Sequence, residues 1–215
     1  MNFFLPLDSL LLLALSVVSL TSVAVADSPL TSTDFHPAYE AEPMVSHAAD
    51  SKLLDRAMLN FLTHPDNSSA KKLAVMNAIG WQFDDNWGNS AVFLEHLLKS
   101  KGLKSEYFQL HLAKFSSEEL FLYGYLFALE NYLDDEKLLE ILPLLRVAVA
   151  KHRESYSANL VLTLVECQLQ MHDGDNWQLV WERYAKFLAN EELKRPLNAE
   201  ARATITDYLK LYEEG

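Results

Sequence analysis

Apolar side chains recur along most of the chain at the three- and four-residue spacing of an α-helix, and no stretch alternates apolar and polar residues as a half-buried strand would. From about residue 50 onward, the pattern predicts eight or nine helices joined by short loops. The predicted ranges are 51–63, 69–79, 89–102, 105–114, 116–133, 134–153, 157–171, 177–188 and 198–212.

Polar residues mark the predicted helix ends. Ser116 followed by Glu119 forms a capping box, in which each side chain binds the other residue's backbone N–H. Gly102 suits a C-terminal turn, and Pro143 either kinks its helix or starts a second piece. The other predicted N-caps are Ser51, Ser69, Asn89 or Ser90, Asp134, Asp175 and Asn198.

The predicted helix at 116–133 is apolar almost all round, which places it in the middle of a bundle. Helix pairs begin near residues 51, 89, 117, 157 and 198, so most steps are close to 40 residues. Such a period indicates stacked helical hairpins. The predicted fold is therefore all-α, built of antiparallel hairpins as an α-solenoid or an irregular helical bundle.

Two short patterns resemble the first helix of a tetratricopeptide repeat, with its large, large, glycine, aromatic spacing. They are Leu120, Tyr123-Gly124, Phe127 and, with Trp181 in the glycine position, Trp177, Val180-Trp181, Tyr184. In the second helix, Glu136 and Glu140 replace the family's small and aromatic residues. The resemblance covers about one and a half repeats. It implies an α-solenoid whose groove binds another protein.

Residues 1–26 have the pattern of a Sec-type signal peptide, with an apolar run from Leu10 to Leu20 and Ala24-Val25-Ala26 before Asp27. The segment before the run carries Asp8 and no Lys or Arg, so an uncleaved membrane anchor is the alternative. Residues 27–49 contain three prolines and are expected to form an extended, flexible leader, and residues 50–215 one helical domain. The expected location is periplasmic or secreted.

Charge and cysteine content exclude several classes. A net charge of −12 argues against binding to nucleic acid or to an anionic membrane surface. A single cysteine, Cys167, excludes an internal disulfide framework and a Cys-rich zinc site. Its apolar neighbours predict a buried, inert thiol rather than an intermolecular bridge.

The most unusual stretch combines aromatic and acidic residues between two predicted helices: Trp81, Phe83, Asp84, Asp85 and Trp87. Aromatic ring faces beside carboxylates could bind a peptide, a sugar or a cation. The same composition also suits a loop that is anchored by buried rings. We take these five residues as the candidate partner-binding site.

Catalytic chemistry has little support in the sequence. Seven histidines form no metal-binding spacing, although Glu95 and His96 could approach His111. The acidic pairs Glu118-Glu119, Asp134-Asp135 and Glu191-Glu192 lie at predicted helix starts or turns, where carboxylates favour the helix dipole. No catalytic, cofactor-binding or metal-binding residues are predicted.

The sequence thus predicts an exported, non-catalytic helical module that binds or scaffolds a protein or peptide. One alternative is an envelope assembly factor anchored by an uncleaved N-terminus, which is the only way in which a membrane would be a partner. The other is a hydrolase whose acidic and His groups come from distant positions.

Replacing Trp81 and Trp87 together by Ala tests the aromatic stretch. We expect weaker capture of the partner with unchanged helicity, since exposed rings contribute to binding rather than to folding. Pull-down and circular dichroism measure the two effects, and a loss of helicity would show that the rings belong to the core instead.

Overall fold

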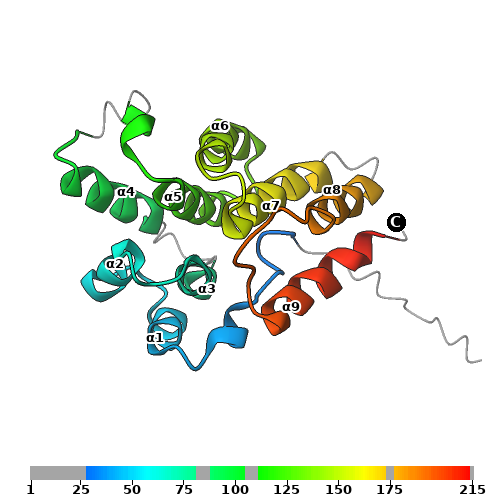
Figure 1. The fold of residues 1–215 in the computed structure, drawn as a ribbon, viewed down its shortest axis with the longest axis horizontal. Helices are drawn as coiled ribbons and strands as arrows, with labels where there is room; N and C mark the ends of the chain where they lie inside the picture. Colours follow the sequence, from blue (N-terminus) through cyan, green and yellow to red (C-terminus); the bar gives the residue numbers. More distant parts are fainter. Residues whose placement is uncertain (1–27, 81–87, 105–110, 173–176, 214–215) are drawn as a thin grey trace, which may run out of the picture.

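A computed structural model describes residues 28–80, 88–104, 111–172 and 177–213. This part of the chain is all-helical, which confirms the predicted fold class (Figure 1). Its nine α-helices are α1 (Pro43–Ser51), α2 (Arg56–Thr63), α3 (Ser69–Ile79), α4 (Asn89–Ser100), α5 (Ser117–Glu130), α6 (Asp135–Lys151), α7 (Tyr156–His172), α8 (Gln178–Leu188) and α9 (Ala199–Leu209). Short 3₁₀ turns span His36–Tyr39 and Lys210–Tyr212.

Consecutive helices from α5 to α8 pack against one another, and α5 also packs against α7. This arrangement places α4, α5, α7 and α8 in one row, with α6 on one side of it (Figure 1). Helices α1, α2, α3 and α9 lie on the other side of the row. Within the described residues, no helix is long and apolar enough to cross a membrane.

Helix α5 lies at the centre of the core. Its start has the predicted capping box, in which the Ser116 side chain accepts from the Glu119 N–H and the Glu119 carboxylate accepts from the Ser116 N–H. Ten of its fourteen residues are buried, on every side of the helix. Because α5 has no polar face, it needs neighbours all round.

The closest approach of α5 to α6 is at Gly124, the glycine of the repeat-like pattern. A Cβ atom added there would lie 2.5 Å from Cδ2 of Leu145 and 3.1 Å from its Cγ. Leu145 is fully buried and cannot move into solvent. A side chain at position 124 would therefore push the two helices apart.

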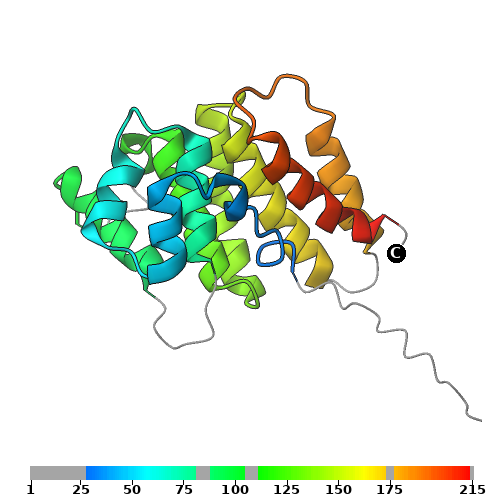
Figure 2. The same ribbon diagram turned by 90° about the horizontal axis from the view of Figure 1, so that it is seen from below.

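The structure corrects the prediction that residues 27–49 form an extended, flexible leader. Residues 28–42 form a packed strap that begins beside α9 and leads to α1, and its 3₁₀ turn packs against both α3 and α9 (Figure 2). Leu30 and Phe35 are fully buried, and the Asn77 carboxamide accepts from the N–H groups of Phe35 and His36 at 2.9 and 2.8 Å. Residues 43–51 then form α1. Pro37 and Pro43 occupy first-turn positions, where proline starts a helix rather than breaking it.

The first predicted helix start is also wrong. Ser51 ends α1, and Lys52 follows it in the left-handed conformation. Asp55 is the true N-cap of α2, since its side chain accepts from the Met58 N–H at 2.9 Å. Several polar residues near this helix start could act as the N-cap, and the sequence pattern alone does not show which of them does.

Three of the other predicted N-caps are confirmed, but Gly88 rather than Asn89 or Ser90 is the N-cap of α4. Ser116, Asp134 and Asn198 cap their helices through their side chains. Ser68 rather than Ser69 caps α3, and Pro143 lies inside an uninterrupted α6. Residues 105–110 of the predicted short helix and the proposed cap Asp175 lie outside the described residues.

Gly124→Val should lower the free energy of unfolding by about 1–3 kcal/mol, because the added side chain collides with Leu145 in the core. Urea unfolding followed by circular dichroism measures this loss. Combining the change with Leu145→Ala should cost less than the sum of the two single losses, since the space that one change empties receives the other. Strictly additive losses would contradict the close approach.

Candidate functional site

Helix α4 ends the row of helices, and α5 is the only described element against which it packs extensively (Figure 1). Phe93 and Leu97 are buried on its inner face. Beside this face, Ala91, Leu94 and Leu98 form a second apolar stripe, in which Ala91 is exposed, Leu94 is half-buried and Leu98 is buried. The helix therefore has more apolar surface than its single neighbour covers.

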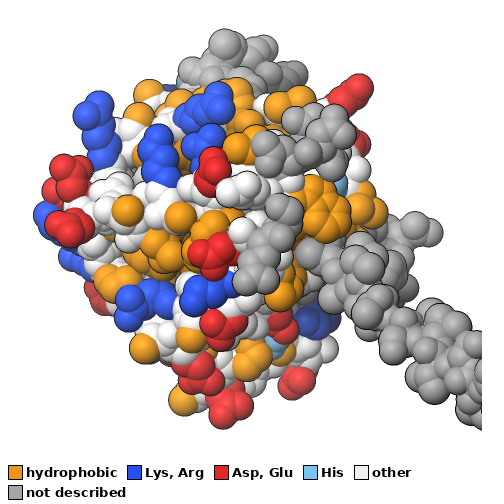
Figure 3. Space-filling view, turned by 90° about the vertical axis from the view of Figure 1, so that its right-hand side faces the viewer, with side chains coloured by type: hydrophobic (Ala, Val, Ile, Leu, Met, Phe, Trp, Pro, Cys, Tyr) orange, Lys and Arg blue, Asp and Glu red, His pale blue; other side chains and the backbone are white. Residues whose placement is uncertain are grey.

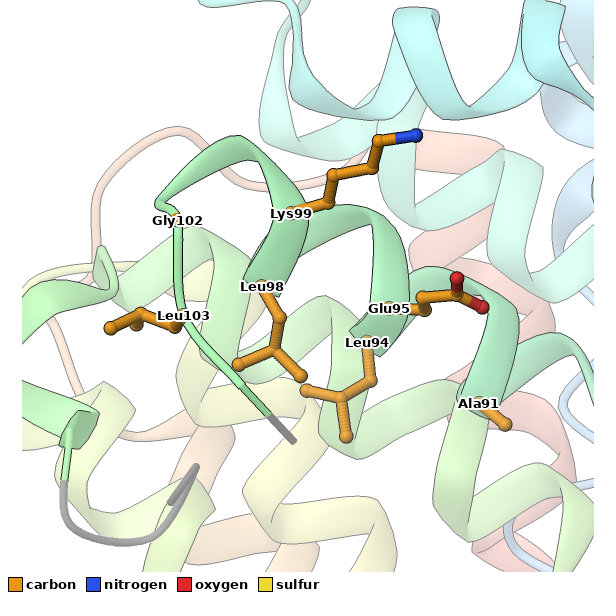
Figure 4. A pocket seen from close by; sticks show the side chains of 7 residues that line it. All are labelled: Ala91, Leu94, Glu95, Leu98, Lys99, Gly102 and Leu103. Carbon is orange, nitrogen blue, oxygen red and sulfur yellow. The ribbon is translucent and has the colours of Figure 1, made fainter. Parts of the chain in front are cut away.

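This second stripe lines a groove of 720 Å³. Its lining consists of Ala91, Leu94, Glu95, Leu98, Lys99, Gly102 and Leu103. Leu94 and Leu98 point to the same side of α4, whereas the side chains of Glu95 and Lys99 point away from them (Figure 4). We call this surface the α4 groove.

Hydrogen bonds tie the N-terminus of α4 to two other parts of the fold. The Glu130 carboxylate accepts from the Ser90 N–H at 2.9 Å and also from the Ser90 hydroxyl. A carboxylate at this position is stabilised by the positive end of the helix dipole. The Asn89 carboxamide accepts from the Leu54 N–H at 2.7 Å and donates to the Lys52 carbonyl at 3.0 Å.

The C-terminus of α4 ends in a Schellman turn. Gly102 has a φ of +64°, its N–H donates to the Lys99 carbonyl at 3.2 Å, and the Leu103 N–H donates to the Leu98 carbonyl at 2.9 Å. This turn brings Leu103 back beside Leu98, which extends the apolar stripe beyond the helix. The conformation needs glycine, so Gly102 shapes one end of the groove.

Lys101 ties this end of α4 to the start of α5. Its ammonium group lies 2.9 Å from the Glu119 carboxylate and 5.2 Å from the centre of the Phe115 ring. Both ends of α4 are thus fixed to the core. The groove is a preformed surface rather than one that must fold on binding.

Two opposite charges border the groove. Glu95 and Lys99 are exposed, lie one helical turn apart, and make no ion pair with any described residue. An apolar stripe with a charged edge matches the way in which an amphipathic helix is recognised, where leucines contribute affinity and charges fix orientation.

The five predicted site residues, Trp81, Phe83, Asp84, Asp85 and Trp87, lie outside the described residues. Their role as a partner-binding site stays a prediction. In the sequence they directly precede Gly88, the N-cap of α4.

Two of the acidic pairs make structural contacts through their side chains. Glu118 accepts from the Ser69 hydroxyl at 2.5 Å and pairs with the buried ammonium group of Lys72. Glu119 completes the capping box, and Asp134 caps α6. Among the described residues, no group of three or more His, Cys, Asp or Glu side chains could hold a metal ion.

Cys167 is fully buried in α7, as its apolar neighbours predicted. Its Sγ donates to the Val180 carbonyl at 3.5 Å, and burial raises the pKa of the thiol. A thiol with a raised pKa is a poor nucleophile. His172 instead contacts Gln168 and Asp135, at 2.9 and 2.5 Å.

Sequence analysis missed the α4 groove. The sequence pattern predicts a helix at 89–102 and singles out Glu95 only as a residue that could approach His111. The spacing of Ala91, Leu94 and Leu98 is an apolar stripe. That signal was present, but only the structure shows that Ala91 and Leu94 are left at least partly uncovered.

Comparisons of the chain with models of known protein families, with curated proteins and with solved structures gave no significant match.

Proposed function

We propose that this chain is an exported, non-catalytic helical scaffold that binds an amphipathic helix of another protein in the α4 groove. The observation that carries the proposal is the groove beside α4, a helix that is held at both ends and whose Ala91 and Leu94 are left at least partly uncovered by the described residues. A helix with apolar side chains at positions i, i+3 or i+4 and i+7 has the shape and spacing to cover this stripe.

The groove supports a binding role on energetic grounds. Leu94 is half-buried, so a partner that covers it removes the rest of its apolar surface from water. Complete burial of a leucine is worth about 1.5–3 kcal/mol, and part of this gain is offset by the loss of motional freedom on association. Leu94, in the middle of the groove, is therefore the expected centre of the binding energy.

Export rests on the pattern of residues 1–26, and the packing of the strap is compatible with cleavage. The predicted cut after Ala26 falls two residues before Ser28. Ser28 is buried, and its N–H donates to the Tyr208 hydroxyl at 2.8 Å. Cleavage at this position would leave the strap complete. The periplasm or the exterior is the proposed location.

The alternative of an envelope assembly factor would use the same groove but keep residues 1–26 as a membrane anchor. It differs from the main proposal only in the N-terminus. No contact among the described residues favours the hydrolase alternative, so we do not develop it.

Leu94→Asp should abolish capture of the partner protein, because it places a charge in the centre of the apolar stripe. The matched control is Leu139→Asp, since Leu139 is an exposed leucine, 57% accessible, on α6. Both variants should keep the helicity of the unchanged protein. Pull-downs from the native compartment, compared by mass spectrometry, should find a protein that the unchanged chain and Leu139→Asp retain and that Leu94→Asp loses. If all three capture the same proteins, the α4 groove is not the binding site.

The N-terminus of the protein purified from its native host should be Asp27, because Ala24-Val25-Ala26 is the cleavage pattern. Edman sequencing or intact mass measures it. A protein that keeps residues 1–26 would favour the anchored assembly factor.

A further inference from the structure

We infer that His172 makes the start of the strap sensitive to pH, so that proton uptake by its imidazole ring releases residues 28–31 from α7. The observation behind this inference is a chain of hydrogen bonds that runs from the strap through Gln168 and His172 to Asp135 on α6. We call Gln168 and His172 the strap latch. The latch shares no residue with the α4 groove, so the inference does not depend on the proposed function.

The strap determines the orientation of the Gln168 carboxamide, which is fully buried. The Ser28 hydroxyl accepts from the N–H groups of Leu30 and Thr31 at 3.2 and 3.3 Å. Its own hydrogen needs an acceptor, and it points to Oε1 of Gln168. The Leu30 N–H also lies 3.3 Å from this atom. Because two donors converge on it, the atom is the carbonyl oxygen, and the NH₂ group of Gln168 faces the other way.

The Gln168 NH₂ group faces His172, where it needs a nitrogen with a lone pair. Its Nε2 lies 2.9 Å from Nε2 of His172, and Nδ1 of the ring lies 2.5 Å from the Asp135 carboxylate. A neutral imidazole satisfies both contacts, with its hydrogen on Nδ1 and its lone pair on Nε2. The chain of hydrogen bonds is therefore complete only while His172 is neutral.

Protonation of the ring breaks this chain. Both nitrogens of an imidazolium carry a hydrogen, so the Nε2–H of His172 points at the NH₂ group of Gln168. If the carboxamide turns to offer its oxygen to the ring, its NH₂ group faces the Leu30 N–H and the strap loses its acceptor. If the ring moves away instead, the buried NH₂ group is left without an acceptor, which costs more free energy than the bond itself contributes.

Release of the strap removes the conflict. Once residues 28–31 have left α7, the Gln168 carboxamide can turn without opposing the Leu30 N–H. The protonated ring then has an acceptor on each side, the Gln168 oxygen and the Asp135 carboxylate. The proton consequently binds more tightly to the released state than to the docked state, and a fall in pH shifts the population toward release.

The groups around the latch do not reverse this preference. Asp135 contacts the ring in both states, so its attraction for the imidazolium does not depend on the strap. The hydroxyls of Tyr208 and Tyr212 lie 3.2 Å apart, and that of Tyr208 accepts from the first N–H of the strap at 2.8 Å. Phenol groups are uncharged between pH 5 and pH 8. Asp173 and Asp175, which come next along the chain, lie outside the described residues.

Hydrogen exchange of the full chain at pH 8 and pH 5 measures the release, with each rate corrected for the intrinsic rate at that pH. Histidine ordinarily changes charge between these two values. Protection of residues 28–36, relative to that of α5, should fall about tenfold at pH 5, because one buried hydrogen bond is lost. His172→Gln should keep the protection seen at pH 8 and lose its dependence on pH, since a glutamine oxygen accepts from Gln168 at either pH.

Two further variants separate the latch from other effects of pH. Charged side chains of both signs are scattered over the end of the molecule that α8 and α9 form, so a general effect on surface charge has to be controlled (Figure 3). The matched control is His64→Gln, since the exposed His64 ring also lies near a carboxylate, 3.9 Å from Asp66. It should show the same fall as the unchanged chain. Asp135→Asn should move the fall to lower pH, because the imidazolium loses its ionic partner.

Two results would overturn the inference. One is strap protection, relative to α5, that is equal at pH 8 and pH 5 in the unchanged chain. The other is a fall that His172→Gln does not remove. If His172→Gln leaves the strap unprotected even at pH 8, Asp135→Asn decides, and a fall that it does not move also overturns the inference.

Discussion

Helix α5 has no face that tolerates water, and this constraint arranges the rest of the described structure. Its buried residues lie all round the helix, so each neighbour must cover a different side. Helices α3, α4, α6 and α7 all pack against it. At Gly124 the absence of a side chain lets α6 come so close that Leu145 fills the space a Cβ would need. Helix α4 covers a remaining side of α5, and no other described helix packs extensively against α4.

Polar groups inside this core are partnered across long distances in sequence. Asn77 on α3 donates to the Tyr125 hydroxyl on α5 at 3.0 Å and accepts from the strap at Phe35 and His36. The Lys72 ammonium group, 1% accessible, pairs with Glu118. Leaving either group without a partner in the core would cost more free energy than the bond itself contributes. These contacts fix how α3, α5 and the strap sit against one another.

Features that depend on neighbouring residues in the sequence could be predicted, and features that depend on distant contacts could not. The capping box of Ser116 and Glu119 and the all-round burial of α5 follow from spacing within one helix. The frequent prolines of the strap predict a flexible leader, and this prediction is wrong. Its order comes instead from Asn77, more than forty residues away, and from Gln168 on α7, which accepts from the Ser28 hydroxyl. No local pattern contains that information.

The candidate site is subject to the same limit. A stripe such as Ala91, Leu94 and Leu98 has the spacing of an ordinary core face, and most such stripes are covered in the folded protein. The sequence therefore predicts a binding site at the aromatic residues between positions 81 and 87 and none on α4. The arrangement of helices shows that α5 covers only one face of α4 among the described elements. The groove becomes evident only from the position of α4 at the end of the row of helices.

With a net charge of −12, two copies of this chain repel each other at long range. Physiological salt screens charges beyond about 8 Å, so the repulsion between whole molecules is reduced more than the contact of adjacent side chains. The net charge thus opposes association between copies of the chain. In the proposed complex with a helix of another protein, Leu94 supplies the apolar contact, and Glu95 and Lys99 fix the direction of the bound helix.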